Sequence, residues 1–271
     1  MPDALRHTRP TRIVQSRQNA RVKELRAALT RSARTAQGLL AIEGEHLLHE
    51  ALASGLELAT VFVETGREAL LDRLRVPMET EVLSLAPDIF ASAVHTESPQ
   101  GIAALVKPRA FTADEIVSGP RPLILIAAGL QDPGNLGTLI RSAEAFGATG
   151  YVVLPGTVSP ENQKALRASA GSIFRLPGMI LCEDHIFGML AERKIKTIAA
   201  VALQGQPLAK LDLTQACALI VGNEGGGIAP EVLRRTDARV TIPTPGPVES
   251  LNAAIAGSIL LYEAARQRSG R

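Results

Sequence analysis

The sequence of 271 residues lacks tryptophan, and aromatic residues make up only 3% of it. We therefore do not expect an RNA-binding surface that relies on stacked aromatic side chains. Cysteine is also scarce: Cys182 and Cys217 are far apart and form no C-x-x-C pair. This arrangement supports neither a disulfide framework nor a zinc site. We expect no bound metal, and we expect both cysteines to be small core residues in a reducing compartment.

Long apolar runs are missing as well, since no stretch approaches the length of a membrane span. The first ten residues, MPDALRHTRP, carry charge but lack the apolar centre of a secretory signal. We therefore expect a cytoplasmic protein without a membrane partner. Hydrophobic residues make up 46% of the chain and charged residues 21%. These fractions predict a globular protein of one large domain or two ordinary ones.

Positive charge is concentrated at the start of the chain. The net charge is only +2, but residues 1–34 contain nine Lys or Arg and two acidic residues. A basic arm on a neutral body suggests a polyanionic partner, of which nucleic acid is the usual one. A solvated, frayed terminus is the alternative explanation. Our RNA-binding hypothesis for this segment names Arg17, Arg21, Lys23 and Arg26.

The pattern of apolar residues predicts an α/β protein in four parts. Residues 1–34 form a basic helical segment, and residues 35–107 alternate short strands and helices in a small α/β domain. Residues 108–120 begin and end on proline without a sustained period, which predicts a linker. Residues 121–271 form a larger domain, whose strands are continuous apolar runs such as LILIAA and ALIVG. Such runs are typical of a parallel sheet that is covered by helices on both faces.

The last helix of the chain is apolar around most of its circumference. Leu251, Ile255, Ile259 and Tyr262 form one stripe, which Leu260 and Leu261 widen. A helix of this kind is buried in the core or covered by a partner subunit.

Three strand ends of the larger domain combine glycines with polar side chains. They read LQDPGNLGTLIR, LIVGNEGGGIAP and VTIPTPGPVESLNAA, and none contains G-x-G-x-x-G or a P-loop. Taken singly, each has an ordinary explanation: a tight turn, a helix cap at Ser250 or a solvated Arg141. Together they predict a ligand pocket, because ligands of open α/β sheets bind at the carboxyl ends of strands.

These strand ends resemble the three motifs of the SpoU (TrmH-like) branch of SPOUT-class RNA methyltransferases. The motifs appear in the family's order across about 120 residues, which is far more specific than one glycine-rich loop. One departure is Thr244, where the family usually has Met. The matching segments are Asn135-x-Gly137-x-x-x-Arg141-x-Ala143, Gly222-Asn223-Glu224-x-x-Gly227 and Ile242-Pro243-x-x-Gly246-x-x-x-Ser250-Leu251-Asn252.

The resemblance extends over nearly the whole chain. NARVKELRAAL, GLLAIEGEHLLHEAL and TESPQGIAALV look like the small ribosomal-protein-like RNA-binding domain that precedes the catalytic domain in many members. The family implies a deep trefoil knot in the catalytic domain, a homodimer formed through that domain, and transfer of methyl from S-adenosylmethionine to a ribose 2′-hydroxyl. The N-terminal domain favours 23S ribosomal RNA over transfer RNA as the substrate.

The resemblance also implies roles for individual residues. Arg141 orients a phosphate and stabilises the developing alkoxide; the family also includes proposals that this arginine is the base. Asn135 holds Arg141 or the ribose, and Glu224 holds Arg141, Asn252 or a substrate hydroxyl. Ser250 and Asn252 complete the polar ring. The expected cofactor contacts are Leu203, Gly222, Gly227, Ile242 and Leu251.

Two other classes of function are compared with this hypothesis. A nicotinamide-dependent oxidoreductase predicts G-x-G-x-x-G after the first strand of the larger domain, which is absent. A non-catalytic RNA-binding protein on the same fold predicts a degraded site, whereas all five polar motif residues are present.

Overall fold

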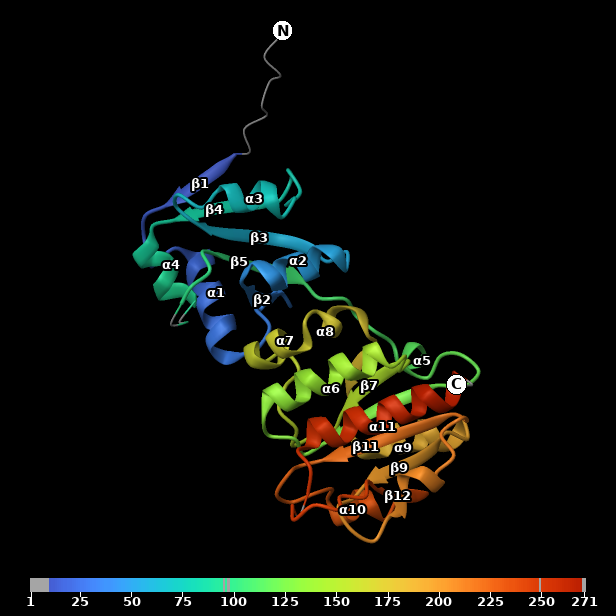
Figure 1. The fold of residues 1–271 in the computed structure, drawn as a ribbon. Helices are drawn as coiled ribbons and strands as arrows, with labels where there is room; N and C mark the ends of the chain where they lie inside the picture. Colours follow the sequence, from blue (N-terminus) through green and yellow to red (C-terminus); the bar gives the residue numbers. More distant parts are fainter. Residues whose placement is uncertain (1–9, 95, 97, 249, 270–271) are drawn as a thin grey trace. The chain divides into compact units, whose positions relative to one another are not determined.

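The computed structural model describes residues 10–94, 96, 98–248 and 250–269. The chain divides into two compact units, with the boundary between Arg109 and Ala110 (Figure 1). This boundary falls inside the predicted linker, residues 108–120. The segment also contains a short helix, α5 (Ala113–Ile116), which Thr112 and Glu115 start through a capping box. Ile116 is fully buried, so part of the expected linker belongs to the core of the second unit.

The first unit is a five-stranded mixed sheet with strand order β1-β4-β3-β5-β2. β1, β4 and β3 run parallel to one another, and β5 pairs antiparallel with both β3 and β2. The strands are β1 (Thr11–Val14), β2 (Leu40–Glu43), β3 (Glu57–Glu64), β4 (Glu81–Leu85) and β5 (Ile102–Lys107).

Helix α1 belongs to this first unit rather than to a separate basic segment. It begins at Asn19, whose side chain accepts from the backbone N–H of Arg21, and it buries Val22 and Leu25 against the sheet. Strand β1, which the sequence pattern did not predict, precedes α1 and pairs with β4. The helices of the unit are α1 (Ala20–Arg31), α2 (Glu45–Ala53), α3 (Ala69–Arg73) and α4 (Pro87–Val94).

The second unit contains a seven-stranded sheet, in which every pairing is parallel and the order is β10-β12-β9-β11-β6-β7-β8. The prediction of a parallel sheet is therefore confirmed. The central strands are buried along their whole length because helices cover both faces. The strands are β6 (Leu123–Ala128), β7 (Gly150–Val153), β8 (Gly178–Ile180), β9 (Lys196–Ala200), β10 (Gln206–Pro207), β11 (Cys217–Gly222) and β12 (Ala238–Thr241).

The sheet carries a separate apolar core on each face. One core joins the sheet to the helices α6 and α11, and the other joins it to α9 and α10. The helical elements after α5 are α6 (Pro133–Ala145), α7 (Gln163–Ser169), α8 (Ser172–Arg175), α9 (Glu183–Glu192), the 3₁₀ turn η1 (Leu208–Lys210), α10 (Pro230–Leu233) and α11 (Ala253–Arg268).

Helix α11 packs against α6 and β11 by a face other than the predicted stripe. Leu260 and Leu261 are fully buried, whereas Ile255 and Tyr262 of the stripe are 54% and 53% exposed. Gly257 explains the close approach: a Cβ there would lie 2.3 Å from Cδ2 of Leu139 on α6. Small residues on α11 thus set which side of the helix faces the core.

Candidate functional site

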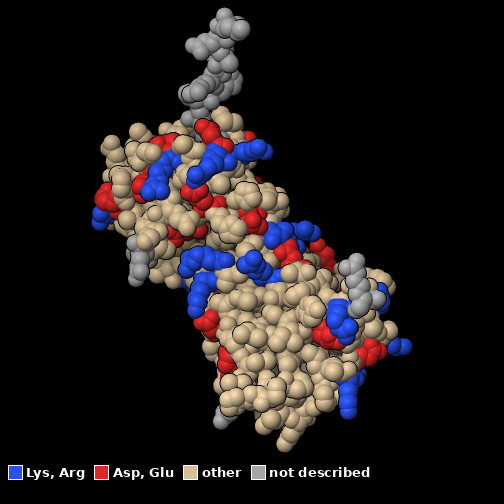
Figure 2. Space-filling view, in the orientation of Figure 1, with Lys and Arg blue, Asp and Glu red and all other residues tan. Residues whose placement is uncertain are grey.

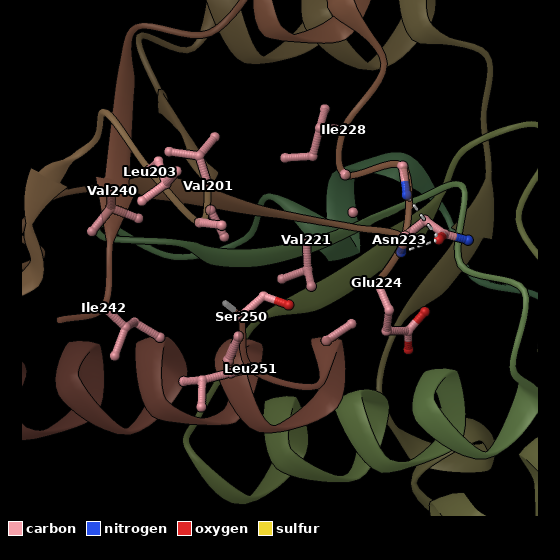
Figure 3. A pocket seen from close by; sticks show the side chains of 18 of the residues that line it. Val201, Leu203, Val221, Asn223, Glu224, Ile228, Val240, Ile242, Ser250 and Leu251 are labelled. Carbon is pink, nitrogen blue, oxygen red and sulfur yellow. Dashed lines mark hydrogen bonds between the residues drawn. The ribbon is translucent and has the colours of Figure 1, made fainter. Parts of the chain in front are cut away.

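A cavity of about 880 Å³ lies at the carboxyl ends of β9, β11 and β12 (Figure 3). Parallel strands bring their carboxyl ends to one edge of the sheet, which is why three separate loops meet there. Most of the lining is small or apolar, and within the described chain Glu224 is its one charged side chain. The lining residues are Ala200–Leu203, Val221–Ile228, Leu233, Val240, Ile242, Thr244, Val248, Ser250, Leu251, Ala253 and Ala256.

The loop after β11 turns back on itself at the edge of the cavity. The backbones of Asn223 and Gly227 exchange two hydrogen bonds, at 3.0 and 2.9 Å. A Cβ at Gly222 would lie 2.5 Å from the Gly227 carbonyl carbon, so only glycine fits at this position. Gly227 has φ +67°, a conformation that glycine adopts without strain. At Gly226, by contrast, a Cβ would meet no atom within 4 Å, so this part of the loop has open space beside it.

The side chain of Asn223 links this loop to the end of β6 by hydrogen bonds. Its Oδ1 accepts from the backbone N–H of Gly225 at 2.8 Å and Gly226 at 3.3 Å. Its Nδ2 donates to the carbonyl of Gly129, which follows β6, at 3.0 Å. No role was predicted for Asn223, although an Asn close to glycines is a known signal for a side chain that bonds its own turn.

Three polar side chains from the three motifs form a chain of hydrogen bonds beside the cavity. Nδ2 of Asn135, in the first turn of α6, donates to Oε1 of Glu224. Nδ2 of Asn252 donates to Oδ1 of Asn135 at 3.2 Å. Oδ1 of Asn252 caps α11 by accepting from the N–H groups of Ala254 and Ile255. The fold thus brings together residues 135, 224 and 252.

The N-termini of two helices, α6 and α11, are therefore linked to one carboxylate: Asn135 bonds Glu224 directly, and Asn252 reaches it through Asn135. The start of α6 is further fixed by Asp132, which accepts from the N–H of Asn135 at 2.9 Å. Lys164 lies 2.6 Å from Asp132, and this hydrogen bond, followed by the one from Asn135, lowers the pKa of the Asp132 carboxyl.

Arg141 stands apart from this group. It lies on α6 beyond Asn135, its side chain is exposed, and it does not line the cavity. Within the described part of the chain, its guanidinium has no hydrogen-bonding or ionic partner. The unpaired guanidinium is available to a group from outside this unit.

The other predicted site residues of the second unit line the cavity. They include Ser250, and Leu203 lies at the mouth with 76% of its surface exposed. Val248, 55% exposed, is a second apolar group of the lining that the sequence analysis did not name. The predicted cofactor contacts Leu203, Gly222, Gly227, Ile242 and Leu251 are all among the lining residues.

The four predicted RNA-binding residues of the first unit have different surroundings. Arg17 pairs with Asp88 at 2.7 Å, and Arg21 pairs with Glu24 and Glu81. Nε of half-buried Arg26 donates to the backbone carbonyl of Ser92 at 2.9 Å, and Nη2 donates to its hydroxyl. Lys23 is exposed, and no partner is found for it among the described residues. Three of the four thus bond within the unit.

Comparison with known proteins gives the class of this fold and site. Residues 122–262 match the model of the SpoU rRNA methylase family, and residues 19–104 match an MRM3-like substrate binding domain. The chain belongs to the SpoU rRNA methylase family.

Two curated relatives are similar along almost their whole length. The chain is 35% identical over 253 residues to the 23S rRNA (guanosine(2553)-2′-O)-methyltransferase RlmP of Bacillus subtilis, covering 92% of this chain and 97% of the relative. It is 32% identical to the 23S rRNA (uridine(2479)-2′-O)-methyltransferase of Streptomyces viridochromogenes, with coverage of 93% and 92%.

Solved structures of the family superpose on the chain as well. The SpoU methyltransferase AviRb from Streptomyces viridochromogenes, in complex with the cofactor AdoMet, gives a TM-score of 0.82 at 29% identity, covering 93% of this chain and 99% of that one. An AdoMet-bound rRNA methyltransferase from Sinorhizobium meliloti gives 0.81 at 27% identity, with coverage of 94% and 98%.

In the described part of the chain, no three His, Cys, Asp or Glu side chains gather in a way that could hold a metal ion. None of the described helices combines the length and hydropathy needed to cross a membrane.

Proposed function

We propose that this protein transfers a methyl group from S-adenosylmethionine to a ribose 2′-hydroxyl of 23S ribosomal RNA. The observation that carries the proposal is the hydrogen-bonded chain Asn252–Asn135–Glu224 at the edge of the cavity. Membership of the SpoU family and the two 23S-directed relatives support the reaction and the substrate.

The residues of the cavity fit S-adenosylmethionine. Its volume, about 880 Å³, is within the usual range for small-molecule sites. The apolar walls suit an adenine ring, and the backbone carbonyls of Gly225 and Gly226 offer acceptors to its polar edge, since the N–H groups of this loop already bond to Asn223. Glu224 suits a donor with a positive sulfonium, because the described lining contains no cation that would repel it. The cofactor would be held by Gly222, Gly227, Ile242 and Leu251, with Leu203 at the mouth.

When bound, S-adenosylmethionine supplies an activated methyl group and departs neutral, so the site needs no acid for the leaving group. The protein must orient the ribose hydroxyl and stabilise its developing negative charge. Asn135 and Asn252 orient Glu224, whose second carboxylate oxygen can accept a hydrogen bond from the ribose. Ser250 offers a hydroxyl on the facing wall of the cavity.

Arg141 would bind the phosphate next to the target ribose. A guanidinium presents a planar fork that matches phosphate oxygens, and its high intrinsic pKa makes it a better electrostatic partner than a base. Since Arg141 has no internal partner in the described chain, its charge is not neutralised before RNA arrives.

A homodimer through the second unit is part of the proposal. Figure 2 shows uncharged atoms over the centre of the face that carries α6 and α11. Ile255 and Tyr262 of α11 are half exposed, and Phe146 at the end of α6 meets Tyr262 edge to face at 5.8 Å. Exposed apolar groups that gather on one face are typical of an interface.

A trefoil knot is proposed for the same unit. Helix α11 follows β12, near one edge of the sheet, and packs on α6 and β11 at its centre. The segment between β12 and α11 lines the same cavity as the loop after β11. A crossing of these two loops is what the family resemblance implies.

Transfer of labelled methyl from S-adenosylmethionine to purified RNA tests the proposal. We expect label on a 23S ribose that is lost with Arg141→Ala. Label on transfer RNA alone would retain the reaction and overturn the substrate. Absence of S-adenosylmethionine binding by calorimetry would contradict the proposed activity and favour the RNA-binding alternative.

A further inference from the structure

The donors and acceptors around Asn252 leave its amide only one orientation. Backbone N–H groups can only donate, so the side-chain atom that faces Ala254 and Ile255 must be the oxygen. The nitrogen of the amide therefore points to Asn135, at 3.2 Å from its oxygen. The N-terminus of α11 thus decides which end of Asn252 faces the neighbouring motif.

The same reasoning continues to the carboxylate. Because Asn252 offers a donor, Asn135 must present its oxygen to Asn252 and its NH2 group to the other side. Glu224 lies on that side, and an ionised carboxylate can only accept. Every pair in the chain is thus one donor and one acceptor, in a single direction from the helix N-terminus to Glu224.

We infer that the N-terminus of α11 fixes the direction of this hydrogen-bond chain, which makes Asn252 a positioning residue for Asn135 and Glu224. The inference rests on the proposed function for its consequence. With Oε1 of Glu224 bound to Asn135, the second oxygen is held as the acceptor for substrate. Asn252 itself does not line the cavity, so its effect on bound cofactor must pass through Asn135 and Glu224.

Asn252→Asp isolates this role from helix capping. Asp caps helices as well as Asn does, so α11 keeps its start. The second carboxylate oxygen of the new aspartate then faces the oxygen of Asn135, and if the Asn135 amide turned over, its oxygen would face Glu224. Two acceptors meet in either arrangement. We expect S-adenosylmethionine affinity, measured by calorimetry, to fall about tenfold.

A second substitution should rescue the first by reversing the chain. In Asn252→Asp/Glu224→Gln, the NH2 group of Asn135 can donate to the new aspartate, and the new glutamine can donate to the oxygen of Asn135. Relative to Glu224→Gln alone, adding Asn252→Asp should then weaken binding by less than about threefold. The added charge is also repelled by the Glu224 carboxylate, which is present only in the wild-type background. The comparison is therefore repeated at high salt, which screens this repulsion but does not remove the mismatch of two acceptors.

Asn19→Asp is the matched control. Asn19 caps α1 with the same pattern, accepting from the N–H groups two and three residues later, and it lies in the other unit. It should leave S-adenosylmethionine affinity unchanged. An equal loss from Asn252→Asp in the wild-type and Glu224→Gln backgrounds would overturn the inference.

A second readout separates this inference from the proposed function. The chain forms without cofactor, so the unfolding temperatures of wild type, the two single variants and the double variant should show the same non-additivity. If the wild-type protein bound no S-adenosylmethionine, the proposed function would fail. The unfolding temperatures of the four proteins would still test the inference. Additive unfolding temperatures would then reject the inference by itself.

Discussion

The two units use their polar residues in different ways. In the second unit, side chains from three distant motifs meet beside one cavity, and the charge of Arg141 stays unpaired in the described chain. In the first unit, most of the basic residues predicted to bind RNA are bonded within the unit, as Arg26 to Ser92 and Arg17 to Asp88 show. The number of basic residues in a segment is therefore a weaker guide to a binding site than several different polar residues that occur in a fixed order at strand ends.

The first unit still has an exposed basic surface, which differs from the predicted one. Lys23 and Arg31 lie on the outer side of α1, with the small residues Ala27 and Thr30 exposed between them. Neither cation has a partner in the described chain. Lys23 and Arg31 are thus available to RNA, whereas Arg17 and Arg26 bond within the unit.

The largest expected effect is that of Arg141→Ala on catalysis. Loss of a preorganised charge that stabilises the transition state costs about 100-fold or more in kcat. The unfolding temperature should not change, because Arg141 is exposed and makes no internal bond in the described chain. Methyl transfer and thermal unfolding measure the two effects. Arg234→Ala, an exposed arginine at the end of α10, is the control, and equal activity of both variants would contradict the assigned role.

Gly222→Ala should mainly impair cofactor binding. Its Cβ would overlap the Gly227 carbonyl, so the loop must shift and S-adenosylmethionine affinity should fall about tenfold or more. Gly226→Ala is the matched control in the same loop, because a Cβ there meets no atom within 4 Å. Calorimetry compares the two variants. Equal affinities would show that the tight backbone approach at Gly222 does not shape the site.

Lys23→Ala/Arg31→Ala should weaken RNA binding without affecting the fold. Each lost phosphate contact lowers the slope of log affinity against log salt by about 0.7 to 0.9. Arg26→Ala should instead destabilise the fold and leave the salt slope of RNA binding unchanged. It removes two hydrogen bonds of a half-buried guanidinium, which costs about 1–2 kcal/mol of unfolding free energy. RNA-binding titrations at several salt concentrations give the salt slope of each variant, and thermal unfolding gives its stability. A larger salt-slope change for Arg26→Ala would restore the original RNA-binding set.

The smallest expected effect concerns Glu263 on α11. Hydrogen bonds from Arg266 and Gln267 lower the pKa of its carboxyl to about 2. A lowered pKa means that this stabilisation is present above the usual pKa of about 4.5 and is lost as the pH falls toward 2. We expect less than about 1 kcal/mol, because the Arg266 side chain is 48% exposed and water screens the pair. Denaturant unfolding between pH 5 and pH 2 should show a shallower acid loss for Glu263→Gln than for wild type.

Part of this molecule follows from its sequence. The apolar runs predicted the parallel sheet, and the second and third motifs predicted residues that line the cavity, because strand ends of a parallel sheet share one edge. The first motif does not line it and is joined to it by the hydrogen bond from Asn135 to Glu224. Two short strands and the buried face of α11 could not be predicted from the sequence pattern. β1 and β8 are strands of four and three residues, too short for a clear period. The buried face of α11 includes Gly257 and three alanines. These small residues contribute little hydrophobic surface, but Gly257 lets α6 approach α11 closely.

The sequence by itself determined the family, the sheet type and the list of candidate site residues, because these depend on local order along the chain. Only the tertiary structure decided which of those residues work together. Asn135, Glu224 and Asn252 come from three motifs far apart in the sequence, and the direction of their hydrogen bonds is imposed by the helix that begins at Asn252. It also decided that Arg26 holds the fold, since its partner Ser92 lies 66 residues further along the chain. Such pairings depend on how distant segments pack, which no local pattern specifies.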